Sequence, residues 1–141
     1  MAYPQLTDKA GALATALAIR TRKISVAEAV DAAITRAGRL DAEIDAIAVP
    51  DFARACETAR AMDQAPRRLD QPLFGVPMTI KESFDVAGLP TTWGHPQFKD
   101  RIAPKDALLV RRLKAAGAII IGKTNVPVDL TDWQSFNPVY G

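Results

Sequence analysis

The chain has 141 residues, of which 48% are hydrophobic and 24% charged, a composition that is typical of a globular protein and excludes a disordered or fibrous one. Its 18 basic and 16 acidic residues are mixed along the sequence, so nothing in their distribution indicates binding to nucleic acid or to an anionic membrane. A single cysteine, Cys56, excludes an internal disulfide and a metal site built from several thiolates. With no signal-like N-terminus and no apolar run of membrane-spanning length, the sequence predicts a cytoplasmic protein.

The N-terminal third of the chain predicts two helices. The first covers residues 8–20, where Thr7 or Asp8 is placed to cap it. Ser25 followed by Glu28 is a capping box, and apolar residues then recur at helical spacing to about residue 40.

A short strand and a third helix follow. The alternating run 44–49 predicts a strand that stops at Pro50, and Asp51 is placed to cap the next helix. The apolar stripe of that helix is Phe52, Ala55, Cys56, Ala59 and Met62. Because this spacing is a packing spacing and no histidine lies nearby in sequence, we interpret Cys56 as a small core residue rather than a nucleophile.

A polar connection, 64–72, leads to a short apolar strand, 78–80, that ends at Lys81. The next stretch is rich in glycine and proline and predicts turns. It holds the only histidine, His95, which we interpret as an exposed loop residue because no catalytic partner is visible.

Asp106 is placed to cap a fourth helix that Gly117 ends. The continuous apolar run after it, 118–121, predicts a strand that is buried on both faces. Helices that alternate with short buried strands indicate an α/β fold.

The stretch "GAIIIGKT" (117–124) matches the phosphate-loop pattern of nucleotide hydrolases letter for letter. A phosphate loop needs flexible backbone between a preceding strand and a following helix. Here a helix precedes the match, stiff isoleucines fill it, and Pro127 disfavours the required helix. We therefore reject nucleotide binding and interpret Gly117 as a helix end and Gly122 as a strand exit.

Lys81 has two interpretations when it is taken alone. A lysine at the end of a strand usually reaches water, whereas burial would depress its pKa and make it a neutral base. Three separated blocks favour the second: the runs "LFGVPMTIKESFDVAGLPTTWG" (73–94), "DALLVRRLKAAGAIIIGKTNVP" (106–127) and "SFNPVYG" (135–141) resemble the amidase signature family of amide hydrolases in order and spacing.

The resemblance implies a serine, cis-serine, lysine triad in which the lysine of the "GVP…K" block corresponds to Lys81. In that mechanism a neutral lysine takes a proton through a bridging serine, and the second serine attacks the amide carbon to give an acyl-enzyme. Backbone N–H groups of a glycine-rich loop stabilise the oxyanion. The resemblance implies a small-molecule amide substrate, and neither a metal nor an organic cofactor.

The only serines, Ser25, Ser83 and Ser135, do not fit the two catalytic positions. Ser25 is a helix cap, Ser83 lacks a second serine beside it, and Ser135 belongs to a block without a catalytic role in the family. The family places both catalytic serines after the "NP.YG" block, where this sequence stops. We therefore expect the N-terminal part of one amidase domain, with a helical portion at 1–64 and an α/β portion at 73–141, a mixed sheet flanked by helices, and no amidase activity in isolation.

Two alternative functions stay open. The glutamine-hydrolysing component of a tRNA-dependent amidotransferase shares the signature, although the segment "VPVDLTDWQSFNP" favours the general amidases. A non-catalytic remnant is the second alternative, and a homo-oligomer is compatible with every one of these functions. Trp93 and Trp133 lie in loop-like stretches, where they line an acyl pocket or, as is commoner for tryptophan, pack in the core.

Overall fold

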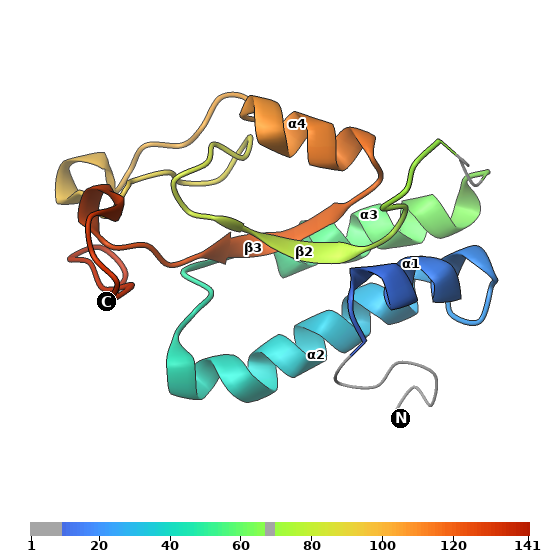
Figure 1. The fold of residues 1–141 in the computed structure, drawn as a ribbon. Helices are drawn as coiled ribbons and strands as arrows, with labels where there is room; N and C mark the ends of the chain where they lie inside the picture. Colours follow the sequence, from blue (N-terminus) through green and yellow to red (C-terminus); the bar gives the residue numbers. More distant parts are fainter. Residues whose placement is uncertain (1–9, 67–69) are drawn as a thin grey trace.

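The computed structural model describes residues 10–66 and 70–141. Its centre is a three-stranded sheet in the order β1-β3-β2, in which β1 (Val49–Pro50) is antiparallel to β3 (Ile119–Thr124) and β2 (Pro77–Lys81) is parallel to it. Three helices lie against one face of the sheet and the fourth lies against the other (Figure 1). This arrangement confirms the predicted α/β class with a mixed sheet flanked by helices.

The first two helices are α1 (Ala12–Arg20) and α2 (Val26–Ile44). The predicted capping box is present, because the Glu28 N–H donates to Ser25 Oγ at 3.0 Å and the Ser25 N–H donates to Glu28 Oε2 at 2.7 Å. The proposed caps of the first helix, Thr7 and Asp8, lie outside the described residues, and α1 begins after Gly11. None of the helices in the described part of the chain is both long and apolar enough to cross a membrane.

The strand predicted over 44–49 is wrong for most of its length. Ile44 still belongs to α2, and the N–H groups of Ala46 and Ile47 donate to the Asp41 carboxylate at 2.8 and 3.0 Å. The segment is therefore held by a side chain of the preceding helix and by one backbone bond, from the N–H of Asn125 just after β3 to the Ala46 carbonyl oxygen at 2.9 Å, and not by a regular strand ladder. Pro50 does not stop the strand, because β1 is an edge strand in which a missing N–H leaves no ladder bond unmade.

The third helix, α3 (Phe52–Gln64), begins at the predicted position. Asp51 occupies the N-cap position but makes no capping hydrogen bond, because its carboxylate accepts from Arg54 Nε at 2.7 Å. Cys56 is half-buried and packs against the helical core, and this burial, reinforced by Asp31, raises the pKa of its thiol. The structure thus agrees with a packing role for Cys56.

The fourth helix, α4 (Leu108–Ala115), begins later than predicted, and Asp106 is not its cap. The Asp106 carboxylate instead accepts from the Ala87 N–H at 2.8 Å and from Lys114 Nζ at 2.8 and 2.9 Å. Gly117 follows the helix as expected, with φ +95° and its backbone packed against Phe74, where a Cβ would lie 2.6 Å from the Phe74 Cα.

Strand β3 is the predicted buried strand, but it is longer than expected. Ile119 and Ile121 pack with α1, α2 and α3, while Ile120 packs in the cluster on the α4 side, so both faces are buried. Gly122 lies inside the strand, which continues to Thr124, and is not its exit. Glycine is required there because a Cβ would lie 2.8 Å from the Val49 carbonyl oxygen of β1. The rejected phosphate-loop match therefore lies mostly within a strand.

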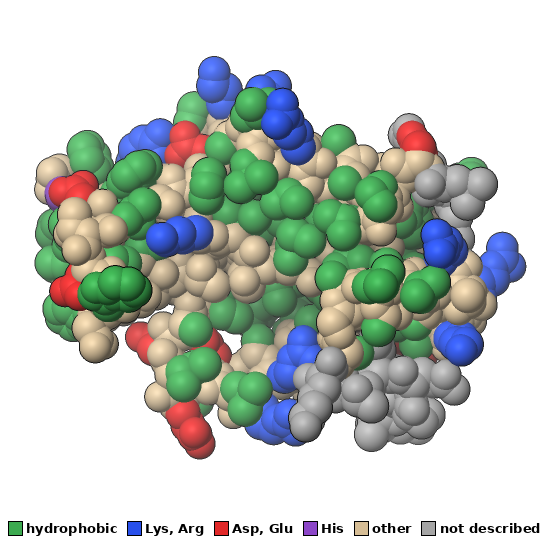
Figure 2. Space-filling model, in the orientation of Figure 1, with side chains coloured by type: hydrophobic (Ala, Val, Ile, Leu, Met, Phe, Trp, Pro, Cys, Tyr) green, Lys and Arg blue, Asp and Glu red, His purple; other side chains and the backbone are tan. Residues whose placement is uncertain are grey.

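The outer edge of β2 has no strand partner among residues 10–66 and 70–141. Figure 2, drawn from the same side as Figure 1, shows hydrophobic side chains gathered over the sheet between α4 and α1. An open edge beside apolar surface is a site at which further polypeptide can pair.

Candidate active site

Lys81 is the last residue of β2, at the edge of the sheet where the parallel strands β2 and β3 both end. It is exposed, and its ammonium group makes no hydrogen bond or ion pair with another described residue. In open α/β sheets ligands bind outside the carboxyl ends of the parallel strands. Lys81 is therefore available for chemistry at the position where such chemistry is expected.

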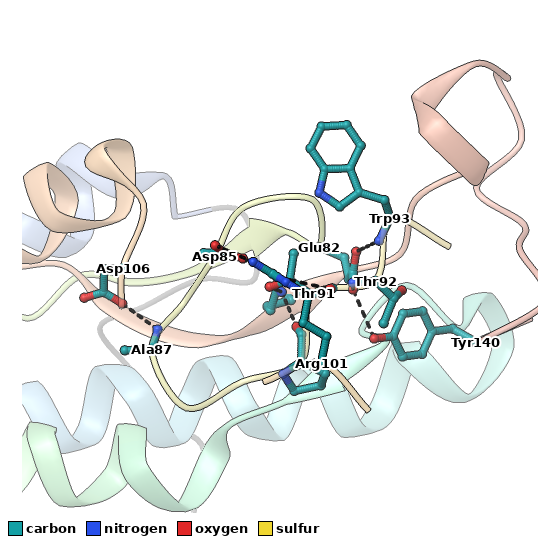
Figure 3. A network of polar contacts seen from close by, with 11 residues as sticks. Glu82, Asp85, Ala87, Thr91, Thr92, Trp93, Arg101, Asp106 and Tyr140 are labelled. Atoms are coloured by element: carbon teal, nitrogen blue, oxygen red, sulfur yellow. Dashed lines mark hydrogen bonds and ion pairs between the residues drawn. The ribbon is translucent and has the colours of Figure 1, made fainter. Parts of the chain in front are cut away.

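Glu82, the next residue, is fully buried. Its carboxylate accepts hydrogen bonds from the backbone N–H groups of Thr92 at 2.6 Å and Trp93 at 3.0 Å, and from the Tyr140 hydroxyl at 3.1 Å (Figure 3). Burial, with the charge of Glu82 adding to it, raises the pKa of Tyr140 to about 12, so this hydroxyl stays a donor. One carboxylate thus joins the end of β2 to two distant segments.

Lys123, in β3, is also fully buried. Its ammonium group donates to the Pro90 carbonyl oxygen and, at 2.8 Å, to Thr91 Oγ1. Burial lowers the pKa of Lys123 to about 8, and the negative charges of Glu82 and Asp85 oppose that shift. A fully buried lysine with two such bonds cannot reach a substrate, so its role is to hold the loop that contains its acceptors.

The two buried ions divide the loop 90–93 between them. Lys123 donates hydrogen bonds to oxygen atoms of the first two residues, and Glu82 accepts hydrogen bonds from the backbone N–H groups of the next two. Trp93 is thereby fixed at φ +55°, and the adjacent Gly94 packs so closely that a Cβ would lie 2.8 Å from that of Asn137. We call residues 90–93 with Glu82 and Lys123 the two-ion clamp.

Asn137 ties the end of the chain to the same edge of the sheet. It is 1% exposed, and its Nδ2 donates to Asn125 Oδ1 and to the Val126 carbonyl oxygen, both at 2.7 Å. Its own Oδ1 accepts from the N–H groups of Val139 and Tyr140 at 2.9 and 3.0 Å. The turn that carries Tyr140 is therefore well fixed.

A cleft of about 490 Å³ opens beside the clamp. It is lined by Ser83, Phe84, Asp85, Thr91, Trp93, His95, Phe98, Arg101, Ala107 and Asp129. His95 is not simply an exposed loop residue, since three quarters of its side chain is buried and Nε2 lies 2.7 Å from Asp129 Oδ1. Arg101 and Asp85 form a second pair, with N–O distances of 2.8 and 3.0 Å, and these hydrogen bonds hold the pKa of Asp85 below its usual value.

The structure leaves Lys81 without a serine partner in the described part of the chain. Ser25 caps α2 as predicted, Ser83 is half-buried at the cleft, and Ser135 is exposed. None of the three hydroxyls is hydrogen-bonded to Lys81.

Sequence reasoning missed Glu82 and Lys123. The phosphate-loop pattern draws attention to Lys123 for a reason that fails, yet it is the lysine that this fold buries. A signal was present in the sequence. Glu82 directly follows one apolar strand and Lys123 lies near the end of another, and strands of this kind are buried on both faces, so a charge beside them is a candidate for burial.

Comparison with known proteins gives a consistent result. The sequence model of the family described as Amidase matches residues 28–141. The indoleacetamide hydrolase of Bradyrhizobium diazoefficiens is 41% identical over 132 residues, which cover 92% of this chain and 25% of that protein. A glutamyl-tRNA(Gln) amidotransferase chain of Nitratidesulfovibrio vulgaris is 38% identical over 109 residues, which cover 77% of this chain and 22% of that protein.

The solved structures agree with the sequences. The peptide amidase of Stenotrophomonas maltophilia superposes with a TM-score of 0.79 at 26% identity, over 90% of this chain and 26% of that one. The 141 residues thus span about a quarter of the length of the relatives they match. The family match covers most of the chain, and the protein belongs to the Amidase family.

Proposed function

We propose that the chain is part of one amidase domain and supplies the lysine of an amide hydrolase site, Lys81. The observation that carries the proposal is the position of Lys81 at the carboxyl end of β2, exposed and unpaired among the described residues, in the block that resembles the lysine block of the triad. The membership of the chain in the Amidase family supports the reaction class.

The proposed reaction needs two serines that these residues do not supply. Lys81, uncharged, accepts a proton from a bridging serine, which in turn accepts the proton of the attacking serine. That oxygen adds to the amide carbon, and the proton held by Lys81 returns through the bridging serine to the amide nitrogen. The C–N bond of the tetrahedral intermediate then breaks, which releases a neutral amine or ammonia and leaves an acyl-enzyme. Water then hydrolyses the ester, so that the products are an acid and an amine or ammonia. We place both serines and the oxyanion donors in polypeptide beyond residues 1–141.

A polypeptide segment that covers Lys81 would also remove its ammonium group from water. A water-exposed lysine is protonated at neutral pH and is a poor base, whereas desolvation favours its neutral form. Lys123, one strand away, demonstrates the effect within this sheet, because burial lowers its pKa to about 8. The open edge of β2 beside Lys81 is where we place the covering segment.

A second candidate is the glutamine-hydrolysing component of a tRNA-dependent amidotransferase. It is favoured by the 38% identity to the amidotransferase chain of Nitratidesulfovibrio vulgaris. The general amidases remain our first choice because of the segment after Thr124. We also place the protein in the cytoplasm, on the grounds of its single cysteine.

A chimera tests the role of Lys81. Residues 1–141 replace the matching segment of the Bradyrhizobium diazoefficiens indoleacetamide hydrolase, and hydrolysis of indole-3-acetamide is followed by ammonia release. Because a positioned general base contributes about 10²- to 10⁴-fold, we expect Lys81→Met to lower kcat by at least about 10²-fold. Lys105→Met, at an exposed loop position, is the matched control and should leave kcat unchanged.

The purified 141-residue chain, assayed in parallel, should release no ammonia. An active chimera whose rate survives Lys81→Met would overturn the proposal, and so would robust turnover by the 141-residue chain alone.

A further inference from the structure

Trp93 is held in an unusual backbone conformation without packing in the core. Its φ of +55° lies in the left-handed region, which is costly for a bulky side chain and persists only when the surroundings enforce it. The two-ion clamp supplies that enforcement, through Glu82 at the Trp93 N–H and Lys123 at residues 90 and 91. Two buried charges and a strained backbone therefore fix a residue that is 42% exposed.

The side chain of Trp93 points away from the polar network that fixes its backbone (Figure 3). It lines the cleft of about 490 Å³ together with the rings of Phe84 and Phe98. That volume lies within the range of about 300–1,000 Å³ that is typical of small-molecule sites. By contrast Trp133 is fully exposed and is not among the residues that line this cleft.

The polar side chains Arg101, Asp85, His95 and Asp129 of the cleft are already paired with one another. Arg101 binds Asp85 through two hydrogen bonds, and His95 binds Asp129. An ionic ligand would have to compete with these pairs, whereas an uncharged ring needs only the apolar surface between them. The lining therefore matches a neutral aromatic group, which stacks on exposed aromatic side chains.

We propose that this cleft is a binding site for a neutral aromatic small molecule and that Trp93 is its principal contact. The site is separate from Lys81: Ile80 packs on the α4 side with Phe84, and successive residues of a strand face opposite sides, so Lys81 faces the other way. The proposal does not depend on the assignment of Lys81 and can fail or succeed without it.

Saturation-transfer difference NMR with benzamide as the probe tests the site on the 141-residue chain. We expect a saturable signal at millimolar benzamide, with at least tenfold weaker signals for acetamide, which lacks the ring, and for benzoate, which carries a charge. Trp93→Ala should weaken apparent affinity at least tenfold, and Trp133→Ala, which removes the other exposed tryptophan, should leave it unchanged. Phe98→Ala is a second variant in the same cleft, outside the strained turn, and should weaken binding as well.

Three results would overturn the proposal. They are the lack of a saturable benzamide signal from folded wild-type chain, equal losses in the Trp93 and Trp133 variants, and a signal that disappears in the active chimera. The last would show that polypeptide, and not a small molecule, covers the cleft. Because this experiment measures binding and the Lys81 experiment measures turnover, the two proposals are judged separately.

Discussion

Two lysines at the ends of neighbouring strands have opposite environments. Lys123 lies beside Ile80 in the β2–β3 register and is fully buried, whereas Lys81 lies one position further along β2 and is exposed. A register irregularity between Met78 and Thr79 places Lys123 opposite Ile80, so Lys123 shares the α4 side with Ile80 although it lies two residues after Ile121. Lys81, the next residue of β2, faces the other side. Register, more than residue type, decides which lysine becomes structural.

The buried lysine is tolerated because the charges of the clamp have partners. Lys123 has two oxygen acceptors, Glu82 has three donors, and the two charges oppose each other's burial cost. Lys81 has no such arrangement among the described residues, which leaves its ammonium available to another segment or a substrate. The following substitutions test whether this contrast is as large as the geometry indicates.

Lys123→Met should have the largest effect. It leaves the buried Glu82 carboxylate without its opposing charge and removes both bonds to the loop 90–91, a loss of the kind that costs about 3–5 kcal/mol. Urea denaturation followed by circular dichroism measures the change in the free energy of unfolding. Lys105→Met is the control, with an expected change within about 0.5 kcal/mol. A loss of less than about 1 kcal/mol for Lys123→Met, by the same assay, would mean that the clamp contributes little.

Lys123 should also determine how the free energy of unfolding changes with pH. The pKa of Lys123 is about 8 in the folded chain and 10.5 in the reference state, so between these values the unfolded chain binds more protons. Stability therefore rises with pH, by about 2 kcal/mol from about pH 8 to about pH 10, since one pKa unit corresponds to about 1.4 kcal/mol.

Above about pH 10 the sign reverses, because Tyr140, whose pKa is raised to about 12, keeps a proton that the unfolded chain has lost. Unfolding free energies measured across this range in the parent and in Lys123→Met separate the two groups. A parent curve that falls between about pH 8 and about pH 10, the window in which only Lys123 is expected to act strongly, would contradict the assignment.

Local signals in the sequence predicted local structure well. The Ser25–Glu28 capping box starts α2, and the isoleucine run forms a strand that is buried on both faces. Both features depend on residues within a few positions of one another, so a pattern can identify them. The resemblance to the amidase signature, carried by three longer blocks, predicted the family correctly.

Contacts between distant residues were not predictable in the same way. Asp106 has the sequence context of a helix cap, but its partners include the N–H of Ala87, 19 positions away. Lys123 binds the loop at Thr91, 32 positions away, and Glu82 binds Tyr140, 58 positions away. A short pattern does not encode such pairs, which exist only after the strands have paired.

Lys81→Met should have the smallest effect on stability and so complete the contrast. The side chain ends a strand, reaches water and has no partner in the described part of the chain, and methionine keeps most of its apolar stem. We expect the free energy of unfolding to change by less than about 0.5 kcal/mol, as at other unconstrained surface positions. The same urea titration that detects the loss in Lys123→Met measures it. A change of more than about 1 kcal/mol, beyond that surface range, would show that Lys81 stabilises the fold, and a lysine with that duty is less free to serve as a base.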